Sequence, residues 1–179
     1  MNKGILTFVF LIVAFTLKGF SQSVADLERD PSFKGITIGA PISKYSDILS
    51  FSHTSKGKNV YRVREIRYLS IFNYKMDDMF VVENEGKVYA IRLTKTYHAD
   101  ASGAYEFKAQ DMLSLYMSLR QKYGNNSFSL DDMSGTPTVC GVRWKANSVV
   151  LDLVYLFYGT FGDEKPKLIY ELYQREDDY

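Results

Sequence analysis

Few side chains in this sequence could hold a metal or act as nucleophiles. The two histidines, His53 and His98, lie 45 residues apart in polar stretches, and Cys140 is the single cysteine. A metal site needs three or four converging ligands, and the sequence has no His/Cys cluster. A thiolate–imidazole pair can act as a nucleophile, but the apolar neighbours of Cys140 favour a buried, inert thiol over that role or an intermolecular disulfide. We therefore predict no metal and no cofactor.

Paired carboxylates are the remaining candidates for chemistry. They occur in four places: Asp77-Asp78, Glu83 with Glu85, Asp131-Asp132 and Asp163-Glu164. Two carboxylates held at a fixed separation in a cleft can cleave a glycoside, which keeps a hydrolase of an envelope polymer as the enzymatic alternative. Each pair lies in or beside a predicted turn, where acids serve capping and solvation. Asp131-Asp132 could also bind calcium loosely, but the loop lacks the spaced EF-hand pattern. We favour a non-enzymatic protein and predict no catalytic residues.

The most motif-like stretch is FKGITIGAPISKYSDIL, at residues 33–49. A Walker-type phosphate loop would need a Gly-Lys-Ser/Thr ending, and a dinucleotide loop would need three spaced glycines. Neither is present. The stretch instead predicts a short strand at 33–38, a turn at Gly39, and a helix of about two turns that begins at Pro41 and has its apolar residues on one face.

The rest of the chain predicts mostly strands, which suits its 14 tyrosines and 12 phenylalanines. Residues 52–59 and 125–138 read as polar loops, and Asn84-Glu85-Gly86 as a hairpin turn. Strands are expected at 60–73 (broken near Arg64-Glu65), 79–83, 87–97, 139–145, 149–158 and 167–174.

A long helix is expected at residues 105–123 and should end at Gly124. Its predicted core stripe is Ala109, Met112, Leu113, Tyr116, Leu119 and Tyr123. Tyr116 and Trp144 are predicted to be core residues, not ligand contacts.

This order of elements predicts an α+β fold: a two-layer domain with an antiparallel sheet and two helices on one face. Because a helix and several strands occur twice in succession, the order also suggests a tandem α-β-β-β repeat, with halves at residues 33–97 and 104–174.

The first 21 residues are predicted to be a signal peptide. Lys3 precedes a 13-residue apolar run at residues 5–17, and Gly19-Phe20-Ser21 suits cleavage after Ser21. An uncleaved anchor is the alternative, but the run is shorter than the roughly 20 residues that span a membrane. We expect a single exported domain of residues 22–179, periplasmic or secreted, with no stable membrane span after cleavage. Its 20 basic and 21 acidic residues favour neither nucleic acid nor an anionic membrane surface.

The opening GI-x-x-G stretch resembles the start of many small exported bacterial domains. The later order, a helix ending in Tyr123-Gly124, then Trp144, then two apolar strands, resembles the second half of uncharacterised envelope proteins. A helix-plus-sheet unit used twice is similar to the beta-lactamase-inhibitor-like fold. This resemblance implies an association with outer-membrane assembly lipoproteins or with protein inhibitors, and it implies no catalytic residues. The chain lacks the lipobox cysteine of the lipoproteins.

One sheet face is a candidate binding surface. The odd-numbered residues of 149–158 should face the core, together with Leu168, Tyr170 and Leu172, while their neighbours face away. That outer face would combine apolar residues, tyrosines and isolated charges, which is unusual for a monomer unless a loop or a terminal segment covers it. Its predicted binding residues are Arg92, Arg143, Asp152, Tyr158, Glu171 and Tyr173.

The leading functional hypothesis is therefore a non-enzymatic protein-binding or inhibitor-like module of the bacterial cell envelope. Its expected partner is an envelope or extracellular protein. The alternatives are the polymer hydrolase and a subunit that pairs with itself.

Overall fold

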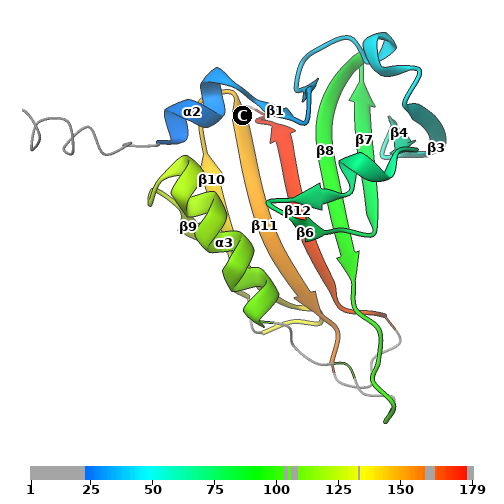
Figure 1. The fold of residues 1–179 in the computed structure, drawn as a ribbon. Coiled ribbons are helices and arrows are strands. Elements are labelled where there is room, and N and C mark those ends of the chain that lie inside the picture. The colour runs from blue at the N-terminus through cyan, green and yellow to red at the C-terminus, as the bar shows by residue number, and fades with distance from the viewer. Residues whose placement is uncertain (1–22, 103–104, 106–108, 133, 160–163, 177–179) are drawn as a thin grey trace, which may run out of the picture.

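The centre of the molecule is one antiparallel sheet of eight strands, in the order β3-β4-β7-β8-β12-β11-β10-β9 (Figure 1). The computed structural model describes residues 23–102, 105, 109–132, 134–159 and 164–176. The strands are β3 (Leu49–Ser55), β4 (Lys58–Val63), β7 (Asp78–Asn84), β8 (Lys87–Thr96), β9 (Phe128–Ser129), β10 (Thr138–Lys145), β11 (Val149–Phe157) and β12 (Lys167–Gln174). The predicted cleavage after Ser21 lies outside the described residues.

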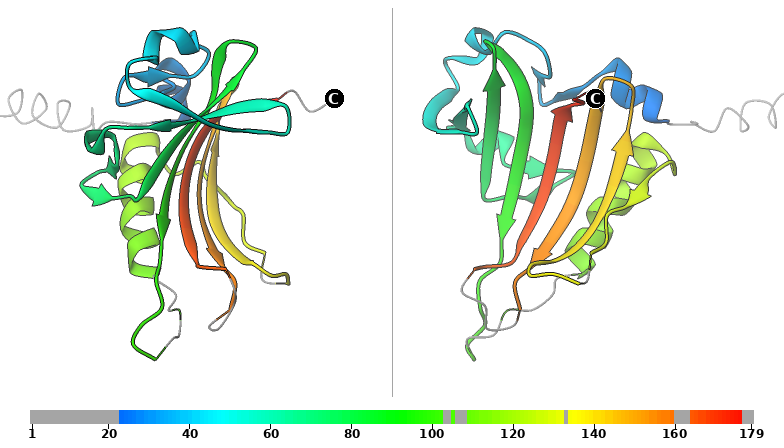
Figure 2. Two further views of the ribbon diagram at one scale, coloured as in Figure 1. Left: turned by 90° about the vertical axis from the view of Figure 1, so that its right-hand side faces the viewer. Right: turned by 180° about the vertical axis from the view of Figure 1, so that it is seen from behind.

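Two helices, α2 (Val24–Arg29) and α3 (Ala109–Tyr123), lie on the same face of this sheet (Figures 1 and 2). The predicted two-layer α+β architecture is thereby confirmed. In α3 the buried stripe runs through Leu115, Leu119 and Tyr123. Leu113, predicted to lie in this stripe, is 50% exposed because the buried face is centred on Leu115 and Leu119 instead. The helix ends as predicted at Gly124, whose φ is +81°.

The short helix α2 was not predicted from the sequence. Its first turn is capped by the Asp26 carboxylate, which accepts a hydrogen bond from the backbone N–H of Ser23 at 3.0 Å. Leu27 is fully buried in the core. Glu28 accepts hydrogen bonds from the backbone N–H and the hydroxyl of Ser148, so α2 is also tied to the turn between β10 and β11.

The motif-like stretch folds differently from the prediction. Residues 33–38 do not form one strand but belong to a small hairpin of β1 (Ser32–Phe33) and β2 (Ile36–Thr37). The two-turn helix expected after Pro41 is a single 3₁₀ turn, η1 (Ile42–Tyr45), and β3 begins at Leu49. The backbone N–H of Ile42 donates to Gly86 O, and main-chain bonds join residues 39 and 40 to Val88. These hydrogen bonds to the β7–β8 hairpin therefore prevent the residues after Pro41 from forming the predicted α-helix.

The predicted polar loop at 52–59 is also wrong, because these residues form the β3–β4 hairpin, turning at Lys56 (φ +48°) and Gly57 (φ +75°). Residues 51–57 are exposed, so the apolar alternation that marks a half-buried strand is missing. In the second loop, residues 128–129 form the short edge strand β9.

The remaining strands follow the sequence closely. The β7–β8 hairpin turns at Glu85 and Gly86, as predicted. The break near Arg64-Glu65 is present, but the strand predicted to continue to residue 73 is wrong beyond it. Residues 64–75 instead form a connector that contains η2 (Ile66–Tyr68) and a small hairpin of β5 (Ser70–Ile71) and β6 (Tyr74–Lys75) outside the main sheet. The bounds of β10, β11 and β12 lie within one residue of the predicted ones.

The core lies between the sheet and the helices. The inward residues of β11 are at most 2% exposed, and those of β12 equally so, as predicted; they are Val149, Leu151, Leu153, Tyr155, Leu168, Tyr170 and Leu172. Trp144 is fully buried, as expected, and donates from Nε1 to Gly124 O at 3.1 Å. Tyr116 is half-buried against it, with ring centroids 6.0 Å apart. Among the described residues, no helix is long and apolar enough to cross a membrane.

Candidate functional site

The outer face of the sheet is the one turned away from α2 and α3. Figure 2 shows that the β3–β4 hairpin projects on this side, opposite α3. The strand register places Arg92 opposite Glu171, Glu171 opposite Asp152, and Asp152 opposite Arg143. Four of the predicted binding residues therefore form a continuous row across β8, β12, β11 and β10.

One end of this row is a closed, hydrogen-bonded cluster. The Arg143 guanidinium donates from Nε and Nη2 to the two carboxylate oxygens of Asp152, each at 2.8 Å, and the Asp152 side chain is only 10% exposed. The Tyr173 hydroxyl also donates to Asp152, at 3.2 Å. Hydrogen bonding to Asp152 raises the pKa of Arg143, while burial and the Asp152 charge raise the pKa of Tyr173 to about 12. The polar groups of these three residues hydrogen-bond to one another, so few of their donors and acceptors are available to a ligand.

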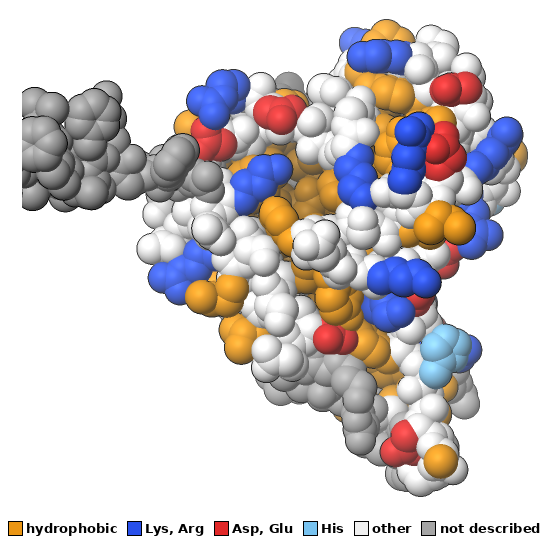
Figure 3. Space-filling view, viewed as in Figure 1, with side chains coloured by type: hydrophobic (Ala, Val, Ile, Leu, Met, Phe, Trp, Pro, Cys, Tyr) orange, Lys and Arg blue, Asp and Glu red, His pale blue; other side chains and the backbone are white. Residues whose placement is uncertain are grey.

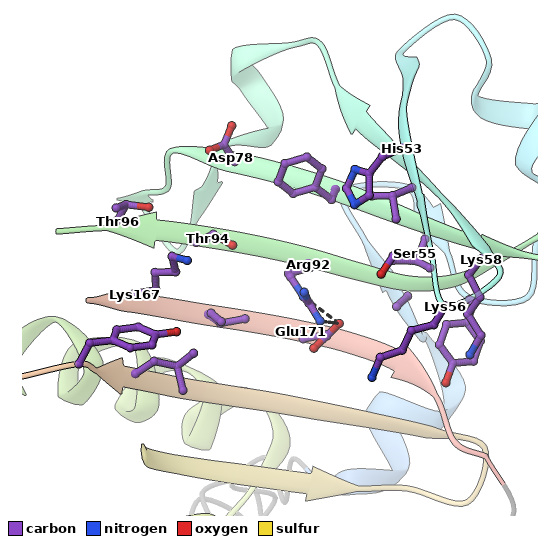
Figure 4. Close-up of a pocket in the computed structure, with 18 residues that line it drawn as sticks. His53, Ser55, Lys56, Lys58, Asp78, Arg92, Thr94, Thr96, Lys167 and Glu171 are labelled. Atoms are coloured by element: carbon purple, nitrogen blue, oxygen red, sulfur yellow. Dashed lines mark hydrogen bonds and ion pairs between the residues drawn. The ribbon is translucent and has the colours of Figure 1, made fainter. Parts of the chain in front are cut away.

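The other end of the row is open. Arg92 Nη2 lies 2.8 Å from Glu171 Oε1, and the Arg92 side chain is 48% exposed. It points into a pocket of about 650 Å³ on the outer face (Figure 4). This volume lies in the range of small-ligand pockets.

The pocket has an apolar floor supplied by alternate residues of five strands. Because side chains alternate across a strand, every second residue of each strand reaches this face. The apolar residues lining the pocket are Val60, Phe80, Val82, Ala90, Leu156 and Ile169. Thr94 and Thr96 extend the floor along β8.

The walls of the pocket are cationic. Four of the lining residues are basic and two are acidic: Lys56, Lys58, Arg92 and Lys167 against Asp78 and Glu171. Figure 4 shows Lys56 and Lys58 reaching in from the β3–β4 hairpin, while Arg92 and Lys167 rise from the sheet. The lining thus carries a formal charge of +2, which favours an anionic occupant.

The β3–β4 hairpin, which forms one wall of the pocket, is hydrogen-bonded to Glu176, the second residue after β12. We call this contact the latch. The Glu176 carboxylate accepts hydrogen bonds from Lys58 Nζ at 2.8 Å and from the Tyr89 hydroxyl at 2.6 Å. The Lys58 ammonium also lies 3.5 Å from the centre of the Tyr89 ring. These two hydrogen bonds lower the pKa of Glu176.

The structure divides the six predicted binding residues into two groups. Arg92, Tyr158 and Glu171 line the pocket. Arg143, Asp152 and Tyr173 lie on the same face but in the closed cluster. Sequence reasoning missed the hairpin residues His53, Ser55, Lys56 and Lys58, because their segment reads as a loop. The polar alternation of β8 could have indicated Thr94 and Thr96.

Among the described residues, the other sequence candidates do not converge, and Asp163 lies outside these residues. The acids have local partners: Asp77 accepts from Lys95 and the Thr96 N–H, Glu83 from Asn59 and the Gly86 N–H, and Asp131 from the Gly141 N–H. In the part of the chain that the structure describes, no group of three or more His, Cys, Asp or Glu could hold a metal ion. Cys140 is half-buried, and burial raises its pKa, which disfavours the reactive thiolate.

Comparison of the chain with protein-family models, with curated proteins and with solved structures gives no match.

Proposed function

We propose that this protein is a non-enzymatic protein-binding module of the bacterial cell envelope, with an inhibitor-like mode of action in which a partner segment occupies the outer-face pocket. The observation that carries the proposal is the pocket itself: an apolar floor and cationic walls on the sheet face that the helices leave uncovered. Export to the periplasm or beyond belongs to this proposal and rests on the leader-like residues 1–21. The beta-lactamase-inhibitor-like resemblance belongs to it as well, although the predicted first half, residues 33–97, contains no α-helix, so the tandem α-β-β-β repeat with these bounds is wrong.

The occupant that fits best is an extended acidic segment of another protein that also carries apolar side chains. Its apolar side chains would cover Phe80, Val82 and Ile169, which lie on neighbouring parts of the floor. Its carboxylates would meet Lys56 and Lys167, which line the walls; the Lys167 ammonium lies 3.8 Å from the Glu164 carboxylate. Burial of apolar area would supply affinity, and the charges would supply orientation and a faster association rate.

A peptide selection tests this proposal. Random peptides displayed on phage are selected on the immobilised protein, and the enriched sequences are synthesised. We expect enrichment of Asp and Glu beside apolar residues, and we expect Lys56→Glu with Lys167→Glu to weaken peptide binding by tenfold or more, consistent with about 1.4 kcal/mol.

The matched control is Lys122→Glu, a charge reversal on the exposed last turn of α3, on the other side of the sheet. It should leave peptide binding unchanged. Enrichment of basic peptides, or equal loss with the control, would refute the proposed occupant. If the double variant and the parent bind the selected peptides equally, the pocket is not the docking site.

A further inference from the structure

The charge of the chain is distributed unevenly. Residues 32–76 contain eight Lys and Arg but only two Asp and Glu, a formal charge of +6, whereas the whole chain carries +1. The remaining residues therefore carry −5, from 14 basic and 19 acidic side chains. Seven of the eight basic residues of this segment are exposed, and Lys58 is half-buried. The near-zero net charge of the whole chain therefore conceals a strongly basic segment at residues 32–76.

The connector at residues 64–75 combines this charge with exposed apolar side chains. It lies on the helix side of the sheet, opposite the outer-face pocket (Figure 2). Ile71 turns inward and is 3% exposed, whereas Ile66 is 78% and Phe72 47% exposed. Arg64, Arg67 and Lys75, all exposed, belong to the same twelve residues, as does Glu65, which forms an ion pair with Arg67 at 2.6 Å. Exposed apolar side chains and basic side chains therefore lie next to one another on this surface.

Lys34 adds a further cation at the connector. Its ammonium donates to the Arg67 carbonyl oxygen and, at 2.7 Å, to the Ser70 hydroxyl. It reaches the connector from the turn of the β1–β2 hairpin. Figure 3 shows Lys and Arg side chains gathered over this part of the helix-side face, with hydrophobic side chains between them.

The backbone conformation and the exposure of Phe72 are both unfavourable for the stability of the fold. Phe72 and Asn73 form the two-residue turn between β5 and β6, with φ of +46° and +69°. Such turns favour Asn or Gly at both positions, and a bulky residue at positive φ is uncommon. A phenylalanine held there with half of its surface in water is unfavourable for both the backbone and the side chain. Backbone strain tends to cluster at functional sites.

We infer that the connector, with Lys34, is a docking surface for an anionic lipid bilayer. Ile66 and Phe72 would enter the boundary between head groups and acyl chains, and Lys34, Arg64, Arg67 and Lys75 would contact the anionic head groups. Each cation near such a surface contributes about fivefold in affinity. Docking through the helix side leaves the outer-face pocket turned toward the aqueous phase, so this inference is independent of the proposed function.

A soluble polyanion would also bind the cations, but it gives no role to Ile66 and Phe72. Exposed apolar side chains ringed by cations match the layered chemistry of a bilayer surface, in which charge lies outside and hydrocarbon inside. The two exposed apolar side chains are therefore the observation that separates the two kinds of partner.

The test is co-sedimentation of the full chain with vesicles of equimolar phosphatidylglycerol and phosphatidylcholine, and with vesicles of phosphatidylcholine alone. The variant is Ile66→Ser with Phe72→Asn, which keeps the charge and places a turn-forming residue at the strained position. The control is Leu113→Ser with Phe128→Asn, which removes two similarly exposed apolar residues, 50% and 61% exposed, from α3 and from β9 at the opposite edge of the sheet. All proteins share the same first 21 residues, so differences between them report on the substituted surface.

We expect binding to the anionic vesicles to exceed binding to the neutral ones, to fall by about tenfold or more in the connector variant, and to persist in the control. The connector variant should melt no lower than the parent. Equal binding by the parent and the connector variant, with loss only in Arg64→Glu with Arg67→Glu, would identify the surface as a polyanion site and overturn the lipid inference. Equal binding to both vesicle types would overturn it as well.

Discussion

Arg143 and Asp152 face each other across the β10–β11 pair and are joined by two hydrogen bonds of 2.8 Å, with the carboxylate side chain 10% exposed. Arg92 and Glu171 repeat this pairing two strands away, but there the arginine is about half exposed at the edge of an open pocket. The Arg143–Asp152 pair therefore has a structural role, whereas the Arg92–Glu171 pair is available to a partner.

This difference predicts unequal effects on stability. Asp152→Ala leaves a half-buried guanidinium and the Tyr173 hydroxyl without their acceptor, and should lower the free energy of unfolding by about 2–3 kcal/mol. Glu171→Ala removes a more solvated partner and should cost less than about 1 kcal/mol. Urea denaturation of both variants measures the difference. Equal losses would mean that the two pairs have the same environment.

Trp144 should be the most sensitive aromatic residue of the core. It is fully buried against Tyr116, so Trp144→Ala should lower the free energy of unfolding by about 3–5 kcal/mol. Leu113→Ala, on the exposed side of α3, should change it by less than about 0.5 kcal/mol. A thermal melt of Trp144→Ala that matches the parent would contradict the assignment of Trp144 to the core.

Asp77 should make the fold sensitive to acid. Burial alone would raise its pKa, but hydrogen bonds from Lys95 at 2.9 Å and from the Thr96 N–H at 2.8 Å lower it below the ordinary 3.8. Because the pKa is lower in the folded state, the carboxylate contributes stability above its unfolded pKa, and that contribution is lost as the pH falls through the folded value. Asp77→Asn should therefore melt below the parent at pH 7, and this gap should narrow below about pH 4. A gap of constant size between pH 7 and pH 3 would show that the charge plays no part.

The latch at Glu176 should hold the hairpin wall of the pocket. Glu176→Gln weakens the bond from the Lys58 ammonium, so amide hydrogen exchange in β3 and β4 should become faster while β11 and β12 stay protected. The lowered pKa of Glu176 has the same sign as that of Asp77, so acid should loosen the parent hairpin as well. Unchanged exchange in the variant would mean that strand pairing alone positions the wall.

Strong apolar patterns made much of the fold predictable. The alternation in residues 149–158 and 167–174 placed β11 and β12, and its core assignments are correct except for Phe157, which is only half-buried. It also placed Arg92 and Arg143 on one side of the sheet, a relationship that the strand register confirms. The alternation failed at residues 51–57 of the β3–β4 hairpin, because these residues are exposed and show no apolar face.

Tertiary contacts account for the other errors. The residues after Pro41 show helical spacing, but their backbone groups bond to the β7–β8 hairpin, so only a 3₁₀ turn forms. The pocket itself was beyond sequence reasoning, since its cationic wall comes from the hairpin that reads as a loop. The basic connector was hidden for a different reason: a net charge near zero averages a segment of +6 with a remainder of −5.

The central claim is that a partner docks in the outer-face pocket, and site-specific photo-crosslinking tests it most directly. A photoreactive residue replaces Ser55, which is exposed at the pocket wall, or Ser114, which is also exposed, on α3 across the sheet. The protein is then irradiated in the cells that produce it. We predict one discrete adduct from position 55, none from position 114, and loss of the adduct when Lys56→Glu and Lys167→Glu are added. Equal adducts from both positions, or an adduct at position 55 that survives the charge reversals, would contradict the claim.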